Sequence, residues 1–232
     1  MSKVMVITGT RKGIGRYLAE YYLEKGMIVC GCSRGESDLQ SEKYHHFCLD
    51  VADEKAVKKM ISSIAKKYRR IDYLINNAGM ASMNHSLLTP LSIVEKLFKT
   101  NVFGTFLFSR ECAKIMSRDN YGRIINFTTV AAPLYLEGES VYAASKAAIE
   151  SLTRTLSKEF GVYGVTVNAI GPSPIKTDLI KNVGESKLEK LLDKQAIKCF
   201  GAFKDVSNII DFYISDNSKM ISGQILYIGG VF

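Results

Sequence analysis

The segment Thr8-Gly9-Thr10-Arg11-Lys12-Gly13-Ile14-Gly15 decides the fold of this 232-residue chain. It follows an apolar run at residues 4–7 that predicts a buried strand, and it opens a helical pattern over residues 14–25. Glycines let the backbone turn sharply and approach a pyrophosphate closely. The N-terminus of the following helix offers free N–H groups and the positive end of its dipole. A glycine triplet alone also fits an ordinary tight turn, but its place between a strand and a helix favours dinucleotide binding.

The same alternation of strand and helix continues to the end of the chain. Strands are predicted at residues 4–8, 28–32, 46–49, 73–76, 123–128, 165–170 and 224–228. Helices are predicted at residues 14–25, 54–68, 91–117, 140–163, 185–195 and 204–215. The strands are too continuously apolar for a sheet with one wet face, which is typical of parallel strands buried between helices. We therefore expect a Rossmann-type α/β fold, a doubly wound parallel sheet of about seven strands with helices on both faces, in a single domain spanning residues 1–232.

The least regular segment, residues 171–203, contains three glycines and two prolines and follows the sixth predicted strand. Ligands of open α/β sheets bind beyond the carboxyl ends of the strands, so this segment is a candidate substrate lid. A loop without a function is the alternative.

Composition excludes several other classes. No apolar run approaches the length of a membrane-spanning helix, and residues 1–8 lead straight into a strand without the architecture of a signal peptide. The five cysteines show no CxxC spacing, which indicates reduced, mostly buried thiols and a cytoplasmic location. The net charge of +8 is scattered or lies on one amphipathic helix, so nucleic-acid binding has no support. No cluster of His, Cys and carboxylates has the spacing of metal ligands, and we expect no metal.

Ser33-Arg34 ends the second predicted strand, where a site selective for NAD usually has an acidic residue that binds the ribose 2′-hydroxyl. A guanidinium suits a 2′-phosphate and a carboxylate would repel it. Arg34, with Lys12 pointing to the same place, therefore favours NADP(H) over NAD(H). The alternative is that Arg34 is a solvated charge.

Tyr142 and Lys146 are four residues apart and share one face of a predicted helix. An ammonium close to a phenol lowers the pKa of the tyrosine and suits it to general acid–base chemistry. Thr129, at the end of the fifth predicted strand, is placed to hold a substrate carbonyl beside the phenol. Ser145 next to Lys146 has no nearby histidine to make it a nucleophile.

Taken together, these motifs resemble the short-chain dehydrogenase/reductase family over nearly the full length, with the nearest likeness to 3-oxoacyl-[acyl-carrier-protein] reductases. The matching residues, in family order, are Thr8-Gly9, Gly13-Ile14-Gly15, Asp50-Val51, Asn76-Asn77-Ala78-Gly79, Asn101, Thr129, Tyr142, Lys146, and Asn168, Pro172 and Thr177. Two departures are Thr129 in place of the usual serine, which adds a methyl group and narrows the carbonyl pocket, and Ser173 in place of a glycine after Pro172.

The resemblance implies a role for each matching residue. The catalytic residues would be Tyr142 as proton donor, Lys146 bonded to the nicotinamide ribose, Thr129 at the carbonyl and Asn101 holding a water that links Lys146 to solvent. The cofactor would be bound by Gly9, Thr10, Arg11, Lys12, Gly13, Ile14, Gly15, Ser33, Arg34, Asp50, Val51, Asn77, Ala78, Gly79, Tyr142, Lys146, Pro172, Ile175 and Thr177. Asp50 would accept from the adenine amino group, and Ile175 and Thr177 would bond the nicotinamide amide.

We therefore predict a reductase that transfers hydride from NADPH to a ketone, or oxidises the secondary alcohol in reverse. The family favours a 3-oxoacyl thioester. The alternatives are a sugar, steroid-like or secondary-metabolite ketone, or a nucleotide-binding sensor without turnover. The family also implies a homotetramer or dimer built on the two longest helices. The apolar residues 134–136 either line a substrate pocket or pack on a partner subunit.

Overall fold

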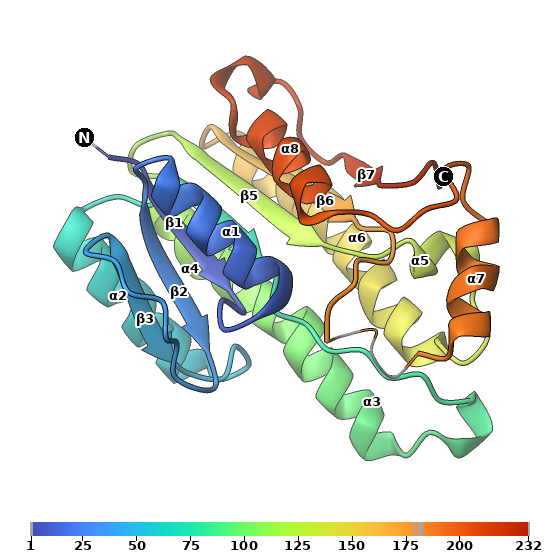
Figure 1. Ribbon diagram of the computed structural model, residues 1–232. Coiled ribbons are helices and arrows are strands. Elements are labelled where there is room, and N and C mark those ends of the chain that lie inside the picture. The colour runs from blue at the N-terminus through green and yellow to red at the C-terminus, as the bar shows by residue number, and fades with distance from the viewer. Residues whose placement is uncertain (1, 179, 181–182, 232) are drawn as a thin grey trace.

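The computed structural model describes residues 2–178, 180 and 183–231, and within them one parallel sheet of seven strands forms the centre of the molecule (Figure 1). The strand order is β3-β2-β1-β4-β5-β6-β7, so the direction of winding reverses between β1 and β4. Ligands of such sheets bind at this reversal. The strands are β1 Val4–Thr8, β2 Ile28–Ser33, β3 Tyr44–Cys48, β4 Tyr73–Asn76, β5 Gly122–Phe127, β6 Val165–Gly171 and β7 Ile225–Tyr227.

Helices cover both faces of the sheet (Figure 1). Helices α1 and α8 pack together on one face, while α2, α4 and α6 pack on the other. The described helices are α1 Gly13–Glu24, α2 Glu54–Tyr68, α3 Leu91–Phe98, α4 Gly104–Met116, α5 Ala131–Leu134, α6 Ser140–Gly161, α7 Glu185–Asp193 and α8 Phe203–Ile214, with 3-10 turns at Ser86–Leu88 and Asp216–Ser218. The expected doubly wound α/β fold is confirmed.

Strand β1 shows why the sequence folds into three layers. Its side chains alternate between the two faces, so that Val4 and Val6 join the core beneath α2 and α4. Met5 and Ile7 join the core beneath α1 and α8. A strand that is apolar on both faces is stable only between two layers of helices, and all five residues of β1 are buried.

The single helix expected at residues 91–117 is the main difference from the sequence prediction. The structure divides it into α3, a π-helical turn at Lys99–Phe103, and α4. A continuous hydrophobic pattern cannot reveal one extra residue in a helical turn, because the pattern resumes on the next turn. The short helix α5 and the turn Ser86–Leu88 were also not predicted, since elements this short leave no period to recognise.

The irregular insert at residues 171–203 is closed at its base by backbone contacts. Ile175 forms an isolated bridge with Gly201, and Gly201 donates its N–H to Pro174 O at 3.0 Å. The insert therefore leaves the sheet and returns to nearly the same point, carrying α7 over the carboxyl ends of the strands.

Two smaller predictions can be compared with the structure. Cys30, Cys32 and Cys112 are buried free thiols, whereas Cys48 and Cys199 are exposed and also free. Within the segment 134–136, the first and last residues pack against a small apolar cluster that includes Leu191, and Tyr135 is exposed.

In the described part of the chain, no helix is both long and apolar enough to cross a membrane.

Candidate active site

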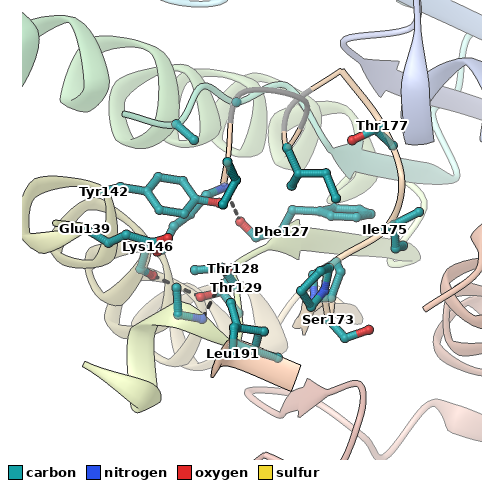
Figure 2. Close-up of a pocket in the computed structure, with 18 of the residues that line it drawn as sticks. Phe127, Thr128, Thr129, Glu139, Tyr142, Lys146, Ser173, Ile175, Thr177 and Leu191 are labelled. Carbon is teal, nitrogen blue, oxygen red and sulfur yellow. Dashed lines mark hydrogen bonds between the residues drawn. The ribbon is translucent and has the colours of Figure 1, made fainter. Parts of the chain in front are cut away.

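A cavity of about 390 Å³ lies at the carboxyl ends of the central strands (Figure 2). Its wall combines segments far apart in the sequence: the glycine loop, the ends of β4 and β5, the start of α6, and the insert. Figure 2 shows Tyr142, Glu139 and Lys146 on one side of the cavity, facing Ser173, Ile175 and Thr177 on the other. Of the residues predicted for the site, those that line the cavity are Ile14, Asn77, Gly79, Thr129, Tyr142, Lys146, Pro172, Ile175 and Thr177.

The glycine loop is shaped for close backbone approach. Gly9 has φ +78°, in the left-handed region, and a Cβ on Gly15 would lie 2.3 Å from the carbonyl oxygen of Gly9. Asn77 fixes this loop to β4 by donating from Nδ2 to Thr8 O at 2.9 Å, and Ala78 N donates to Thr8 Oγ1 at 2.9 Å. Helix α1 begins without a side-chain cap, so no cap side chain binds the first N–H groups of the helix.

The loop after β2 is approached by Arg11 and not by Lys12. A Cβ on Gly35 would lie 2.8 Å from Arg11 Nη1, so the guanidinium covers this loop. Lys12 instead donates to Asp178 Oδ2 at 2.9 Å. The expectation that Lys12 points toward Arg34 is therefore wrong, because a carboxylate of the insert attracts it to the other side.

Ser33 and His46 hold the loop after β2 in place. Ser33 Oγ donates to Gly35 O at 2.6 Å, and His46 Nε2 lies 2.9 Å from the same oxygen and 3.1 Å from Ser33 Oγ. Tyr44 links His46 Nδ1 to Thr10 Oγ1, with distances of 2.9 and 2.8 Å. The sequence analysis assigned His46 no role in the site; in the sheet it pairs with Gly31 of β2.

Asp50 and Val51 follow β3 as predicted, but they differ in exposure. Asp50 is exposed, and its Oδ1 accepts from Ala52 N at 2.9 Å. Val51 is buried, and a Cβ on Gly104 would lie 2.7 Å from its Cγ2. Val51 thus packs against the first turn of α4.

Tyr142, Thr129 and Lys146 meet at the inner end of the cavity. The Tyr142 phenol and the Thr129 side chain, from the end of β5, line the same cavity and lie close enough for the hydroxyl of Thr129 to act on the pKa of the phenol. Lys146, one turn later on α6 and 6% exposed, donates from Nζ to Phe127 O at 2.7 Å (Figure 2). Burial lowers the pKa of Lys146 to about 8.

The lowered tyrosine pKa expected from the sequence is not found. Burial raises the pKa of Tyr142 to about 12, and the charge of Glu139 adds to this, while the nearby Thr129 side chain acts in the opposite direction. The Lys146 ammonium is committed to a backbone carbonyl, so desolvation of the phenol dominates. The phenol of Tyr142 consequently keeps its proton over the neutral pH range.

Asn101 lies in the π-helical turn and is 1% exposed. Its Oδ1 accepts from Met80 N at 2.9 Å, and its Nδ2 donates to Met80 O and to Ser145 Oγ, both at 3.0 Å. Ser145 in turn donates to Tyr142 O at 2.7 Å, so its hydroxyl is fully used in structure. A Cβ on Gly79 would be 3.4 Å from both Asn101 Oδ1 and Lys146 Nζ, which shows how closely these two groups approach.

The partly buried carboxylate of Glu150, next to the end of β5, was not predicted from the sequence. Thr128 Oγ1 and Tyr227 OH both donate to Glu150 Oε1 at 2.6 Å. These bonds connect the end of β5, α6 and the last strand next to Thr129.

Asn168 was matched to the family only by its spacing. Its side chain joins β6 to the segment before β7, because it donates to Ile221 O and accepts from Gln224 N.

These observations identify the class of protein. A family model described as short chain dehydrogenase matches residues 3–188. The chain is a short-chain dehydrogenase. It is accordingly an NAD(P)-dependent oxidoreductase that acts on CH–OH or C=O groups.

Three similar proteins illustrate the range of this short-chain dehydrogenase's relatives. A 3-oxoacyl-[acyl-carrier-protein] reductase of Staphylococcus epidermidis is 29% identical over 99% of this chain and 98% of its own length. The solved structure of ElxO with NADP bound has a TM-score of 0.90 at 29% identity, covering 98% of this chain and 97% of that one. A 4-hydroxyisoleucine dehydrogenase complexed with NADH has a TM-score of 0.88 at 27% identity, covering 99% and 98%.

The residues of this short-chain dehydrogenase fit a dinucleotide. Gly9 and Gly15 leave room where a Cβ would collide, and the uncapped start of α1 can receive a phosphate. The path from there runs past Asn77 and Gly79 to Lys146, all of which line the same cavity.

Proposed function

We propose that this short-chain dehydrogenase reduces a ketone with NADPH, or oxidises the corresponding secondary alcohol in reverse. The observation that carries the proposal is the meeting of Tyr142, Thr129 and Lys146 in one cavity with the glycine loop and Thr177. Carbonyl reduction requires a proton donor, a hydroxyl group that binds the carbonyl oxygen, and a groove for the cofactor. We propose that this cavity combines all three.

Each residue has a proposed role. Bound nicotinamide supplies the hydride to the carbonyl carbon. Tyr142 gives a proton to the carbonyl oxygen, and its raised pKa keeps that proton available at neutral pH. Thr129 holds the same oxygen by a hydrogen bond, and Lys146 bonds the ribose. Asn101 is proposed to bind the water that supplies protons to Lys146, consistent with their close approach at Gly79.

The remaining predicted residues are proposed to bind the cofactor along its length. The glycine loop and α1 receive the pyrophosphate, Asp50 and Val51 the adenine, Asn77 to Gly79 the adenosine ribose, and Pro172, Ile175 and Thr177 the nicotinamide. Arg11, Ser33 and Arg34 favour the 2′-phosphate of NADPH over a free hydroxyl. The guanidinium of Arg11 lies over the loop after β2, which supports a preference for NADPH over NADH.

Two ketone classes remain candidates for the substrate. The relatives named 3-oxoacyl-[acyl-carrier-protein] reductase favour a 3-oxoacyl thioester. A polar ketone, such as a sugar or a secondary metabolite, is favoured by a buried carboxyl group in the cavity wall, Glu139. The alternative to an enzyme is a nucleotide-binding sensor without turnover. The presence of Tyr142, Thr129 and Lys146 in one cavity argues against it.

We further propose that the chain is a single domain whose segment 171–203 closes over the substrate, since Ile180, Val183 and Leu188 line the cavity. Exposed Phe103 and Phe106 on the outer side of the π turn and α4 support a homo-oligomer, a tetramer or dimer, through this face. The free thiols support a cytoplasmic location.

The test is the loss of nicotinamide absorbance with NADPH and NADH in parallel, against a short 3-oxoacyl thioester and a panel of ketones. We expect turnover with NADPH and a smaller kcat/KM with NADH. Tight NADPH binding without turnover of any ketone would favour the sensor instead.

A further inference from the structure

Glu139 is a buried carboxyl group in the wall of the active-site cavity. It immediately precedes α6, is 3% exposed and lines the cavity. Among the residues that the structure describes, its Oε2 has no hydrogen-bond partner. A carboxylate removed from water without a partner is costly, so a buried one that opens onto a cavity indicates a ligand that completes it.

Two titratable groups interact with Glu139 from the elements around it, Tyr142 on α6 and Lys187 on α7. Lys187 is exposed and acts on Glu139 only through its field, while the ammonium of Lys146 on α6 is bonded to Phe127 O. Burial raises the pKa of Glu139 to about 7, because the charge of Lys187 compensates too little of the desolvation.

Resting on the ketone reduction proposed above, we propose that Glu139 binds an ammonium group of the substrate, so that the substrate is an aminoketone. An ammonium supplies both the N–H donors and the positive charge that the carboxylate lacks, and charge-assisted hydrogen bonds are about twice as strong as neutral ones. A 3-oxoacyl chain would instead bury Oε2 against alkyl groups.

The place of Glu139 relative to Tyr142 limits where the amine lies. Glu139 is the residue before α6, lines the same cavity as Tyr142 and acts on its phenol through its charge. The ammonium therefore belongs close to the carbonyl, on a neighbouring carbon or one bond further. A cation beside Glu139 also offsets the effect of its charge on Tyr142, so that recognition of the substrate favours proton transfer.

The proposal is tested by pairs of ketones equal in size. Aminoacetone is compared with 2-butanone, which replaces the ammonium by a methyl group, and with hydroxyacetone, which offers a neutral donor. Each is measured at pH 6.5 with NADPH on the wild type, Glu139→Gln and Glu139→Asp. Glu137→Gln, an exposed residue of the same loop, is the matched control. We expect kcat/KM to favour aminoacetone over 2-butanone by about 10- to 100-fold in the wild type and in Glu137→Gln. Glu139→Gln should lose this preference and Glu139→Asp should keep part of it.

An equal ratio in the wild type and Glu139→Gln, or a preference for hydroxyacetone, would overturn the proposal. A calorimetric titration of 1-amino-2-propanol into the enzyme saturated with NADPH gives a readout that does not require turnover. If that amine binds the wild type at least tenfold more tightly than Glu139→Gln while no ketone is reduced, the Glu139 site stands and the proposed reductase function is wrong. If ketones are reduced and the amine binds both proteins alike, the reductase function stands and the Glu139 site is wrong.

Discussion

The ammonium of Lys146 lies 2.7 Å from the carbonyl oxygen of Phe127, and this hydrogen bond ties the N-terminal third of α6 to the carboxyl end of β5. The partner is a backbone dipole and not a carboxylate, so the buried charge is only partly compensated, and its pKa falls to about 8. The position of the Lys146 ammonium is thereby tied to the sheet.

Replacing Tyr142 by Phe should abolish turnover and leave cofactor binding intact. Loss of a general acid costs about 10²- to 10⁴-fold in rate, whereas the ring that contacts the cavity is kept. NADPH oxidation measures the first effect and a fluorescence titration of NADPH the second. Tyr163→Phe, at an exposed position after α6, is the control. A parallel loss of binding and activity, or no loss at all, would disprove the role of Tyr142.

The two directions of the reaction should respond differently to pH. Reduction uses the protonated phenol, which a pKa of about 12 maintains, so its kcat/KM should not rise between pH 6 and 10. Oxidation needs the phenolate, whose fraction rises about tenfold for each pH unit below that pKa. Initial rates in both directions over this range test the prediction. A reductive rate that climbs with pH would contradict it.

Arg11→Ala and Arg34→Ala should each lower kcat/KM for NADPH by about 10- to 100-fold and leave NADH nearly unchanged. Each guanidinium is proposed to form charge-assisted bonds with the 2′-phosphate. Lys12→Ala is an informative comparison, because Lys12 bonds Asp178 beside the glycine loop and its loss should affect both cofactors alike. If the arginine variants weakened NADH as much as NADPH, these residues would not select the phosphate.

Asn101→Ala should destabilise the fold by about 2–3 kcal/mol, since it leaves both backbone groups of Met80 without their partner. Asn84→Ala, in the same segment as Met80 but exposed, should cost less than about 0.5 kcal/mol. Urea unfolding at neutral pH compares the two variants. An Asn101→Ala protein as stable as Asn84→Ala would show that these hydrogen bonds contribute little.

Glu139→Gln should stabilise the protein increasingly as pH rises. The pKa of Glu139 is about 7 when folded and 4.5 as its ordinary value, so the folded state holds the proton more tightly. Wild-type stability therefore falls between pH 4.5 and 7, and glutamine escapes this loss. The difference in unfolding free energy should grow by on the order of 1–3 kcal/mol between pH 5 and pH 8. A constant difference, with Glu137→Gln as reference, would mean that Glu139 titrates normally.

The parallel sheet could be predicted from the sequence because its strands are apolar on both faces and the glycine loop directly follows the first strand. β1 and β4 fall at the predicted residues, and they pair in parallel as expected for strands that are apolar on both faces. The position of Tyr142 and Lys146 on one helix face was also evident, since it depends only on their spacing.

Tertiary contacts decided what the sequence could not show. Whether Arg11 or Lys12 reaches the loop after β2 depends on Asp178, 166 residues from Lys12 along the chain. An acidic residue at a helix start is ordinarily exposed, but Glu139 is buried in the wall of a cavity that Leu188 and Leu191 of α7 also line. The pKa of Tyr142 depends on how completely neighbours exclude water, which no local pattern records.

The π-helical turn at Lys99–Phe103 makes the chain length between α3 and α4 critical. Deleting one residue there would restore a regular α-helix and rotate one flank by about 100° relative to the other. Either the Asn101 amide would swing away from Ser145, or α3 would lose its place against α6. A single-codon deletion in this turn is therefore far more damaging than most substitutions, while the same deletion after Ser117, where the chain is in a surface turn, changes no helix phase.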